Sequence, residues 1–110
     1  MTKIEIFFDK QKRIQGFAVR GHTEFAARGQ DIVCAGISAL AQTAVLGLNR
    51  FLTRQLPVEI EDGLLTCRLP AGLSQEEMNK AQVILETTCL GFQAVKDNYG
   101  EYLIIYKKGV

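Results

Sequence analysis

One cysteine and one histidine are near enough in the sequence to form a catalytic pair. His22 is the only histidine of the 110 residues, and Cys34, one of three cysteines, follows twelve positions later. A cysteine thiolate is a strong nucleophile, and a neighbouring histidine can stabilise it and later protonate a leaving amine. The two residue types therefore predict covalent catalysis at a cysteine.

Cys34 lies where the sequence predicts the beginning of a helix. Apolar residues from Val33 to Leu52 recur every three or four positions, as in an amphipathic helix, and Pro57 sets the latest point at which it can end. Free backbone N–H groups and the positive end of the helix dipole at that start favour the thiolate form of cysteine. The N–H groups of Cys34 and Ala35 could also bind the negative oxygen of a tetrahedral intermediate.

Spacing alone leaves other interpretations of these residues open. Cys34 could simply join the apolar stripe of the helix, because free cysteine is among the most buried residue types. Asp31 could be a plain N-cap of the helix, and Ser38 could be an ordinary helix-surface serine. Cys67 and Cys89 follow the apolar patterns of a strand and a helix, and we expect both to be core thiols.

Two hairpins are predicted to frame the helix. Residues 3–8 and 14–20 read as strands, and the short polar turn between them predicts a hairpin. Asp62-Gly63 is a strong two-residue turn signal. A hairpin centred on it places Val58 opposite Cys67 on one apolar face, so the pattern and the turn agree.

The remaining elements complete the predicted fold. Ser74 and Glu77 form a capping-box pattern at the start of a second helix, and residues 102–106, YLIIY, predict a last strand. The order ββαββαβ predicts an α+β two-layer sandwich in a single domain, residues 1–110, with one mixed or antiparallel sheet and two helices on one face. YLIIY is apolar on both faces, which predicts either a central strand or a homodimer through the outer face of the sheet.

Composition narrows the class of protein. Hydrophobic residues make up 47% and charged residues 23%, and the net charge is +1, so the sequence lacks the basic stripe of a nucleic-acid binder. We see no signal peptide and no apolar run approaching the length of a membrane span, so we expect a cytoplasmic protein without membrane contact. In that reducing compartment the three cysteines should be free, and their spacing matches no metal site. We expect neither a metal nor another cofactor.

The segment from Gly21 to Ser38 carries a more specific signal. Its Gly-His pair, the later glycine and the DIVCA run followed by a serine resemble the ribosomal-processing cysteine protease family, Prp. The length, the element order and the Asp-Gly hairpin fit as well, so the resemblance covers essentially the whole chain. It implies that Cys34 is the nucleophile and His22 the catalytic histidine, with Asp31, Ser38 and Gly21 in supporting places.

The resemblance also implies a substrate. The family consists of small bacterial proteases that form homodimers and remove a short N-terminal extension from the large-subunit ribosomal protein numbered twenty-seven. Between His22 and Cys34, the residues Phe25, Ala26 and Ala27 offer an apolar loop surface. We expect this loop to close over an extended, uncharged peptide with large apolar side chains before the cut. The alternative is a non-catalytic, ribosome-associated peptide-binding module.

Overall fold

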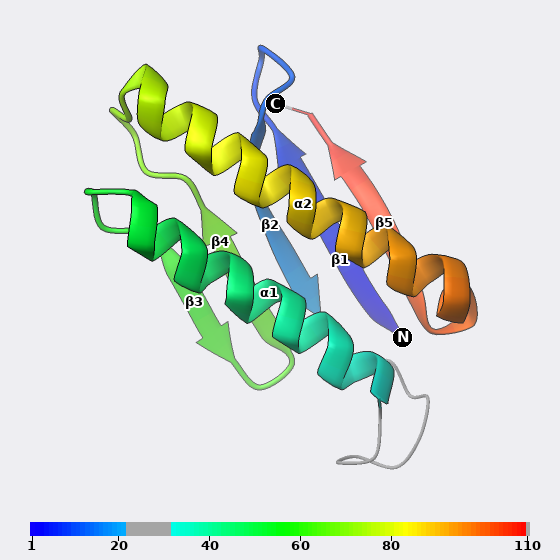
Figure 1. Cartoon of the computed structure of the whole chain (residues 1–110). Helices are drawn as coiled ribbons and strands as arrows, with labels where there is room; N and C mark the ends of the chain where they lie inside the picture. Colours follow the sequence, from blue (N-terminus) through cyan, green and yellow to red (C-terminus); the bar gives the residue numbers. More distant parts are fainter. Residues whose placement is uncertain (22–31, 110) are drawn as a thin grey trace.

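A computed structural model describes residues 1–21 and 32–109 of the chain (Figure 1). Two hairpins, a final strand and two long helices follow one another along the chain in the predicted order ββαββαβ. In chain order the elements are β1 (Thr2–Phe8), β2 (Ile14–Arg20), α1 (Ile32–Phe51), β3 (Val58–Glu61), β4 (Leu64–Arg68), α2 (Gln75–Tyr99), the short 3-10 helix η1 (Gly100–Tyr102) and β5 (Leu103–Lys108).

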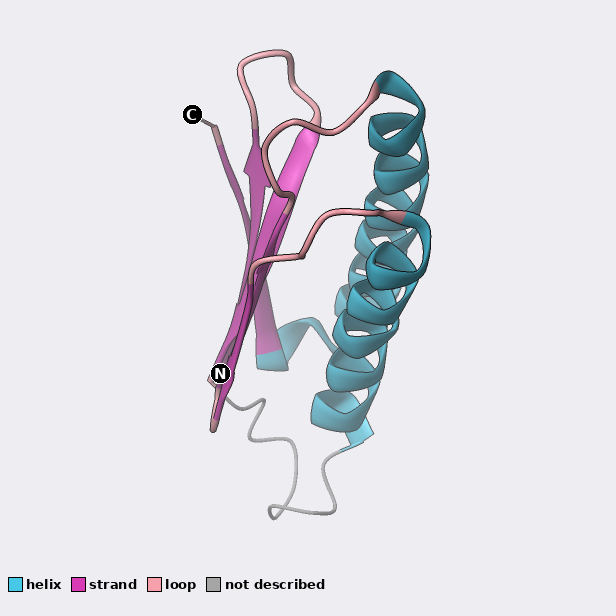
Figure 2. Ribbon diagram, turned by 90° about the vertical axis from the view of Figure 1, so that its left-hand side faces the viewer, coloured by secondary structure: helices cyan, strands magenta, loops and turns pink. Residues whose placement is uncertain are grey.

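The five strands form one mixed sheet with the order β3-β4-β2-β1-β5. All neighbours are antiparallel except β1 and β5, which run parallel because α2 carries the chain across the sheet between β4 and β5. Val58 lies opposite Cys67, so the register predicted for the second hairpin is confirmed. Figure 2 shows both helices on the same face of the sheet. The predicted two-layer α+β sandwich is therefore confirmed.

The core lies between the helix layer and the sheet. Alternate residues of the strands point toward the helices, and residues three or four apart on each helix point back toward the sheet. Phe17 of β2 and Phe92 of α2 meet edge to face, with ring centroids 5.8 Å apart. The largest fully buried apolar side chains are Phe17, Phe92, Ile4, Ile37, Leu48, Leu85, Leu103 and Val33. Burying one such side chain stabilises the fold by about 1.5–3 kcal/mol.

The capping box predicted at the start of α2 is present and extends to α1. The Ser74 hydroxyl accepts a hydrogen bond from the Glu77 amide, and the Glu77 carboxylate accepts one from the Ser74 amide. The same carboxylate accepts a 2.9 Å bond from the amide of Thr53, just beyond the end of α1. The amides of Thr53 and Ser74 lower the pKa of Glu77 to about 2. One side chain therefore joins the end of one helix to the start of the other.

The last strand does not lie in the centre of the sheet. Among the described strands, β5 pairs with β1 alone and forms an edge, so the prediction of a central strand is wrong. The outer face of the sheet also carries a cluster of ion pairs beside the exposed Tyr106. The Glu5 carboxylate pairs with Arg20 at 2.7 Å and with Lys108, which lowers the Glu5 pKa. A dimer through the outer sheet face would bury these charges, and it stays a prediction.

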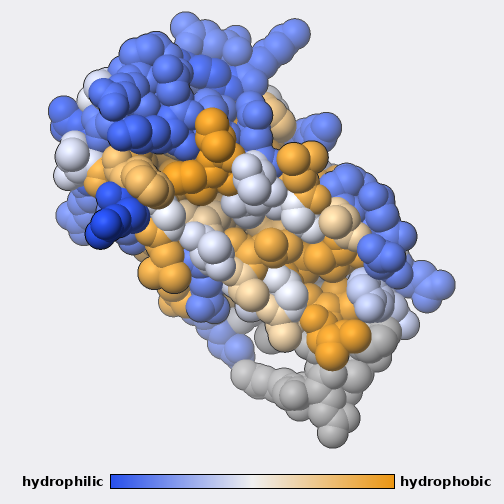
Figure 3. Space-filling view, viewed as in Figure 1, coloured by the Kyte–Doolittle hydropathy of each residue, from blue (hydrophilic) through white to orange (hydrophobic). Residues whose placement is uncertain are grey.

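Exposed apolar side chains gather instead on the helix layer, as the orange areas of Figure 3 show. Leu46 of α1 is 69% exposed, and Val83 and Leu90 of α2 are 66% and 72% exposed. α1 contributes strongly to this surface because it contains no charged residue before Arg50. The helix layer, not the outer sheet face, thus carries the larger uncovered apolar surface of the described residues.

α1 contradicts one expectation from composition. By length and composition it could cross a membrane, with 20 residues and a mean hydropathy of 1.6, so an apolar run of that length does exist. In the fold, one side of α1 is buried, and its buried residues are Val33, Ile37, Ala41, Ala44 and Leu48. The core helix of a soluble protein meets the same criterion, so this property is weak evidence for a membrane span.

Candidate active site

Cys34 is the third residue of α1, so the prediction that it lies in the first turn of a helix is confirmed. The N–H groups of the first turn of an α-helix point toward its N-terminal end, and Cys34 and Ala35 lie at this end of α1. The side chain of Cys34 is half-buried, and Ala35 is exposed. A thiol in this place is open to a reactant and lies near the positive end of the helix dipole.

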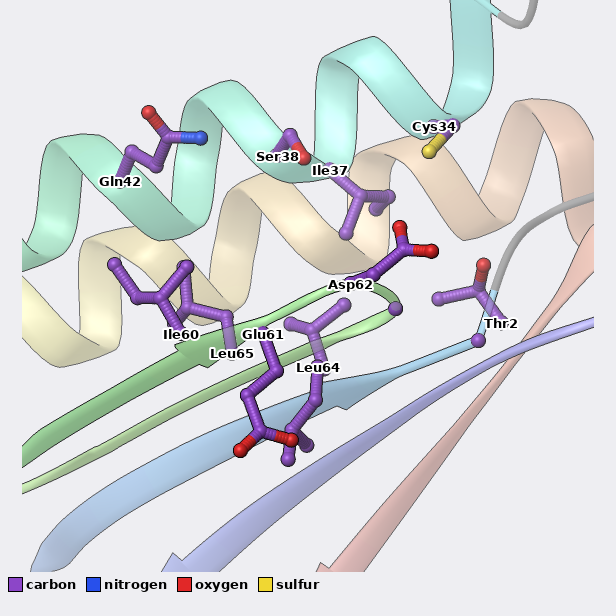
Figure 4. Close-up of a pocket in the computed structure, with 13 residues that line it drawn as sticks. Thr2, Cys34, Ile37, Ser38, Gln42, Ile60, Glu61, Asp62, Leu64 and Leu65 are labelled. Atoms are coloured by element: carbon purple, nitrogen blue, oxygen red, sulfur yellow. The ribbon is translucent and has the colours of Figure 1, made fainter. Parts of the chain in front are cut away.

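A cavity of about 240 Å³ adjoins Cys34. It lies between α1 and the β3–β4 hairpin, and Figure 4 shows Cys34 and Ser38 on the helix above the hairpin residue Asp62. Ile37 and Leu65 provide apolar wall on the two sides. Ser38, one turn after Cys34, is exposed along this cavity. The structure therefore brings two of the predicted site residues, Cys34 and Ser38, together at one pocket.

Gly21 holds the chain just before His22 in a fixed place. Its φ is +81°, in the left-handed region that favours glycine, and an added Cβ would lie 2.9 Å from the carbonyl oxygen of Met1. Its amide donates a 2.7 Å hydrogen bond to the carbonyl of Gly63 in the hairpin turn. Gly21 also lines the cavity, so the end of β2, the hairpin turn and the pocket are connected.

Several predicted site residues lie outside the described residues. These are His22, Asp31 and the three residues of the predicted substrate loop, Phe25, Ala26 and Ala27. The pairing of His22 with Cys34, the capping role of Asp31 and the contact of the loop with a substrate accordingly stay predictions. Within residues 1–21 and 32–109, no three His, Cys, Asp or Glu side chains come together as a metal site would require.

The comparison with known families decides the identity of the chain. The family model described as cysteine protease Prp matches residues 1–104. The chain belongs to the cysteine protease Prp family. The curated ribosomal processing cysteine protease Prp of Bacillus subtilis is 33% identical over 106 residues, which cover 94% of each chain. The protein of the same name from Staphylococcus aureus is 23% identical over 101 residues, or 92% of this chain and 93% of that protein.

Solved Prp structures share the fold. The crystal structure of the S. aureus protease with a covalently linked product peptide gives a TM-score of 0.85 at 24% identity, over 98% of this chain and all of that chain. The complex of the same protease with a substrate peptide gives 0.80 at 23% identity, with the same coverage of both chains. The two-layer architecture found here is therefore that of Prp.

Sequence reasoning missed part of this Prp pocket. The hydroxyl of Thr2 is buried in its wall and has no hydrogen-bond partner among the described residues. Gln42 lines the pocket eight positions after Cys34, a spacing that could have placed both on one side of the helix. Ile60 and Asp62 reach it from the hairpin, which no sequence pattern indicates, because that proximity depends on how α1 lies across the sheet.

The other two cysteines of this Prp chain are poor nucleophiles. Burial raises the pKa of Cys67 to about 12, and burial is also the main reason that the pKa of Cys89 is raised to about 11. At neutral pH only about one part in 10⁴ of a thiol with a pKa near 11 is ionised. Cys67 is buried, and Cys89 packs against the core, so the prediction that both are core thiols is confirmed.

Alkylation will therefore distinguish Cys34 from the other thiols. With iodoacetamide at neutral pH, we expect Cys34 to be modified first, while Cys67 and Cys89 stay protonated and react only as the pH nears their raised pKa values. Peptide mass spectrometry at successive times gives the three rates. The denatured chain is the control, in which all three should react alike. Equal rates in the native chain would contradict the assignment of Cys34.

Proposed function

We propose that this protease removes the short N-terminal extension of the large-subunit ribosomal protein numbered twenty-seven. The observation that carries the proposal is the placement of Cys34, in the first turn of α1 and at the mouth of the pocket. The relatives named ribosomal processing cysteine proteases support the choice of substrate. Cys34 is the nucleophile, and His22 is the general base and acid.

The reaction follows the usual order of covalent catalysis. The Cys34 thiolate attacks the carbonyl carbon of the scissile bond, and the oxygen gains a negative charge that the N–H groups of Cys34 and Ala35 can stabilise. Protonated His22 gives its proton to the leaving amine as the C–N bond breaks, which leaves a thioester on Cys34. His22 then takes a proton from water, the hydroxide attacks the thioester, and the thiolate and the free carboxyl group are released.

The supporting residues act around this pair. Gly21 fixes the backbone next to His22 through its bond to Gly63, and Ser38 lies beside the nucleophile along the pocket. Asp31, which directly precedes α1 in the sequence, is proposed to cap the helix or to orient a neighbouring group. The chemistry needs only a thiol, an imidazole and water, so no cofactor is proposed.

Incubation with the unprocessed ribosomal protein tests the proposed function. We expect a single new N-terminus, identified by mass spectrometry of the product. The matched control is the same ribosomal protein without its extension, which should remain unchanged. Binding of the unprocessed protein without any cleavage would instead support the non-catalytic peptide-binding module and would overturn the proposal.

We further propose that residues 1–110 act as one protease domain in the cytoplasm. The three cysteines are free in the structure, in keeping with a reducing compartment. A homodimer is proposed as well, with the helix layer in the interface. Leu46, Val83 and Leu90 are exposed on the helix layer of the single chain, and α1 has no charge before Arg50 that a second copy of the same face would bury.

Light scattering at micromolar concentration tests the dimer. We expect about twice the chain mass of 12.2 kDa for the natural protein. Leu46→Gln together with Leu90→Gln should lower the measured mass to that of the monomer. Both side chains are exposed in the single chain, so these substitutions should change its stability little. Tyr106→Ser on the outer sheet face is the matched control and should leave the dimer intact. If Tyr106→Ser alone dissociated the dimer, the interface would lie on the outer face of the sheet and not on the helix layer.

A further inference from the structure

The pocket beside Cys34 continues as a groove along α1. Cys34, Ser38 and Gln42 follow one another at intervals of four residues, and all three line it (Figure 4). Eight residues of α-helix span about 12 Å. An extended peptide advances about 3.3 Å per residue. The groove therefore has room for three or four residues of an extended peptide on one side of the nucleophile.

The opposite wall of the groove is the edge strand β3. Ile60 is 67% exposed although it lies on the face of the hairpin that is directed toward α1, where Figure 4 shows it beside Leu65. Ile37 of α1 supplies further apolar wall near Cys34. An exposed isoleucine on the inner face of an edge strand, facing a groove that begins at the nucleophile, is a contact surface for an apolar side chain of a ligand.

The backbone of β3 offers hydrogen bonds at its free edge. Pro57 accepts a 3.1 Å bond from the Arg68 amide, so this pair of residues is a hydrogen-bonded pair of the β3–β4 ladder. Hydrogen-bonded and non-hydrogen-bonded pairs alternate along antiparallel strands. Glu59 and Glu61 therefore bond to β4, and the N–H and C=O groups of Ile60 point away from it. β4 is the sole neighbour of β3 in the described sheet, so these groups of Ile60 face an open edge.

The charges of the groove restrict what it can hold. Glu61 and Asp62 are the charged side chains among the described residues that line it, and α1 adds none there. The Asp62 carboxylate points toward α1, whereas the Glu61 side chain turns away from it (Figure 4). The Asp62 carboxylate repels an acidic side chain near Cys34, and it does not hinder an apolar or a neutral polar one. The groove thus suits an extended peptide without acidic residues.

We propose that the substrate peptide binds as an additional strand on the free edge of β3. The backbone groups of Ile60 bond to the peptide, and alternate peptide side chains enter the groove against Ile60 and Ile37. Gln42 closes the distal end, where its amide can donate to and accept from the peptide backbone. This inference rests on the proposed function, and it makes Ile60 a specificity-determining residue in addition to any contacts made by the predicted loop.

Two substitutions on β3 separate side-chain from backbone contacts. Ile60→Thr keeps a β-branched strand residue but removes the apolar contact, and we expect kcat/KM for a synthetic peptide spanning the cut to fall about tenfold, mainly through KM. Ile60→Pro removes the isoleucine side chain and, in addition, the N–H of residue 60. The β3–β4 ladder does not use this N–H, so an edge strand tolerates the change. It should lower kcat/KM further. Glu59→Thr, on the opposite face of the same strand, is the matched control and should retain the natural value.

Peptides with a single N-methyl group test the same contact without changing the protein. If the peptide pairs with β3, methyl groups on alternate amides should weaken binding to the inactive Cys34→Ala variant, and those between should not. No alternation, together with natural kcat/KM in both Ile60 variants, would overturn the inference. Failure of the natural enzyme to cut the ribosomal protein would instead overturn the proposed function, and binding to Cys34→Ala would still report on the groove.

Discussion

Cys34→Ala will keep the fold and lose cleavage of the unprocessed ribosomal protein by at least about 10⁴-fold. The sulfur is the atom that forms the covalent intermediate, so no neighbouring group can replace it. Alanine is the best helix former, and Cys34 is only half-buried, so α1 should form as before. Single-turnover kinetics followed by mass spectrometry measure the loss, and circular dichroism and the melting temperature check the fold.

Cys34→Ser gives a more stringent form of the same test. Serine has a similar shape and places a hydroxyl where the thiol was, but a serine hydroxyl is far less ionised than a cysteine thiol at neutral pH. We expect the same loss of turnover with substrate binding preserved. Cys89→Ser is the matched control, since Cys89 lies on the other helix away from the pocket and should keep full activity. Turnover at the natural rate in purified Cys34→Ala would exclude Cys34 as the nucleophile.

His22→Ala will reduce the rate of the chemical step by about 10²–10⁴-fold while leaving peptide binding mostly intact. The imidazole is expected to hold the thiolate and then to protonate the leaving amine, and both effects act on the reacting atoms. The measurement is the single-turnover rate constant, with peptide affinity determined separately. His22→Ala at the natural rate would mean that another group is the base.

Asp31→Asn is the informative comparison for His22→Ala. If Asp31 only caps the helix, its loss costs at most about 0.5–2 kcal/mol of stability and changes activity far less than loss of His22. The melting temperature and single-turnover rate of the same preparation distinguish the two roles. A complete loss of activity with an unchanged melting temperature would place Asp31 in the catalytic group.

Local sequence patterns determined most of the secondary structure. The period of α1, the capping box at Ser74 and the Asp62-Gly63 turn each depend on residues near one another in the chain, so they could be predicted from sequence. The position of Cys34 in the first turn of α1 belongs to the same class. The pattern of YLIIY was misleading, because an edge strand can also carry apolar residues: Leu103 is buried and Ile104 and Ile105 are half-buried, although β5 lies at the edge of the described sheet.

The tertiary structure decided what surrounds the nucleophile. The sequence by itself determined the cysteine, its helix and the family resemblance, because these reside in short contiguous motifs. That α1 lies over the β3–β4 hairpin, so that Ile60 and Gln42 line one groove with Cys34, depends on contacts between residues far apart in the chain. The free edge of β3 likewise follows from the order of the strands in the sheet, which no local period encodes.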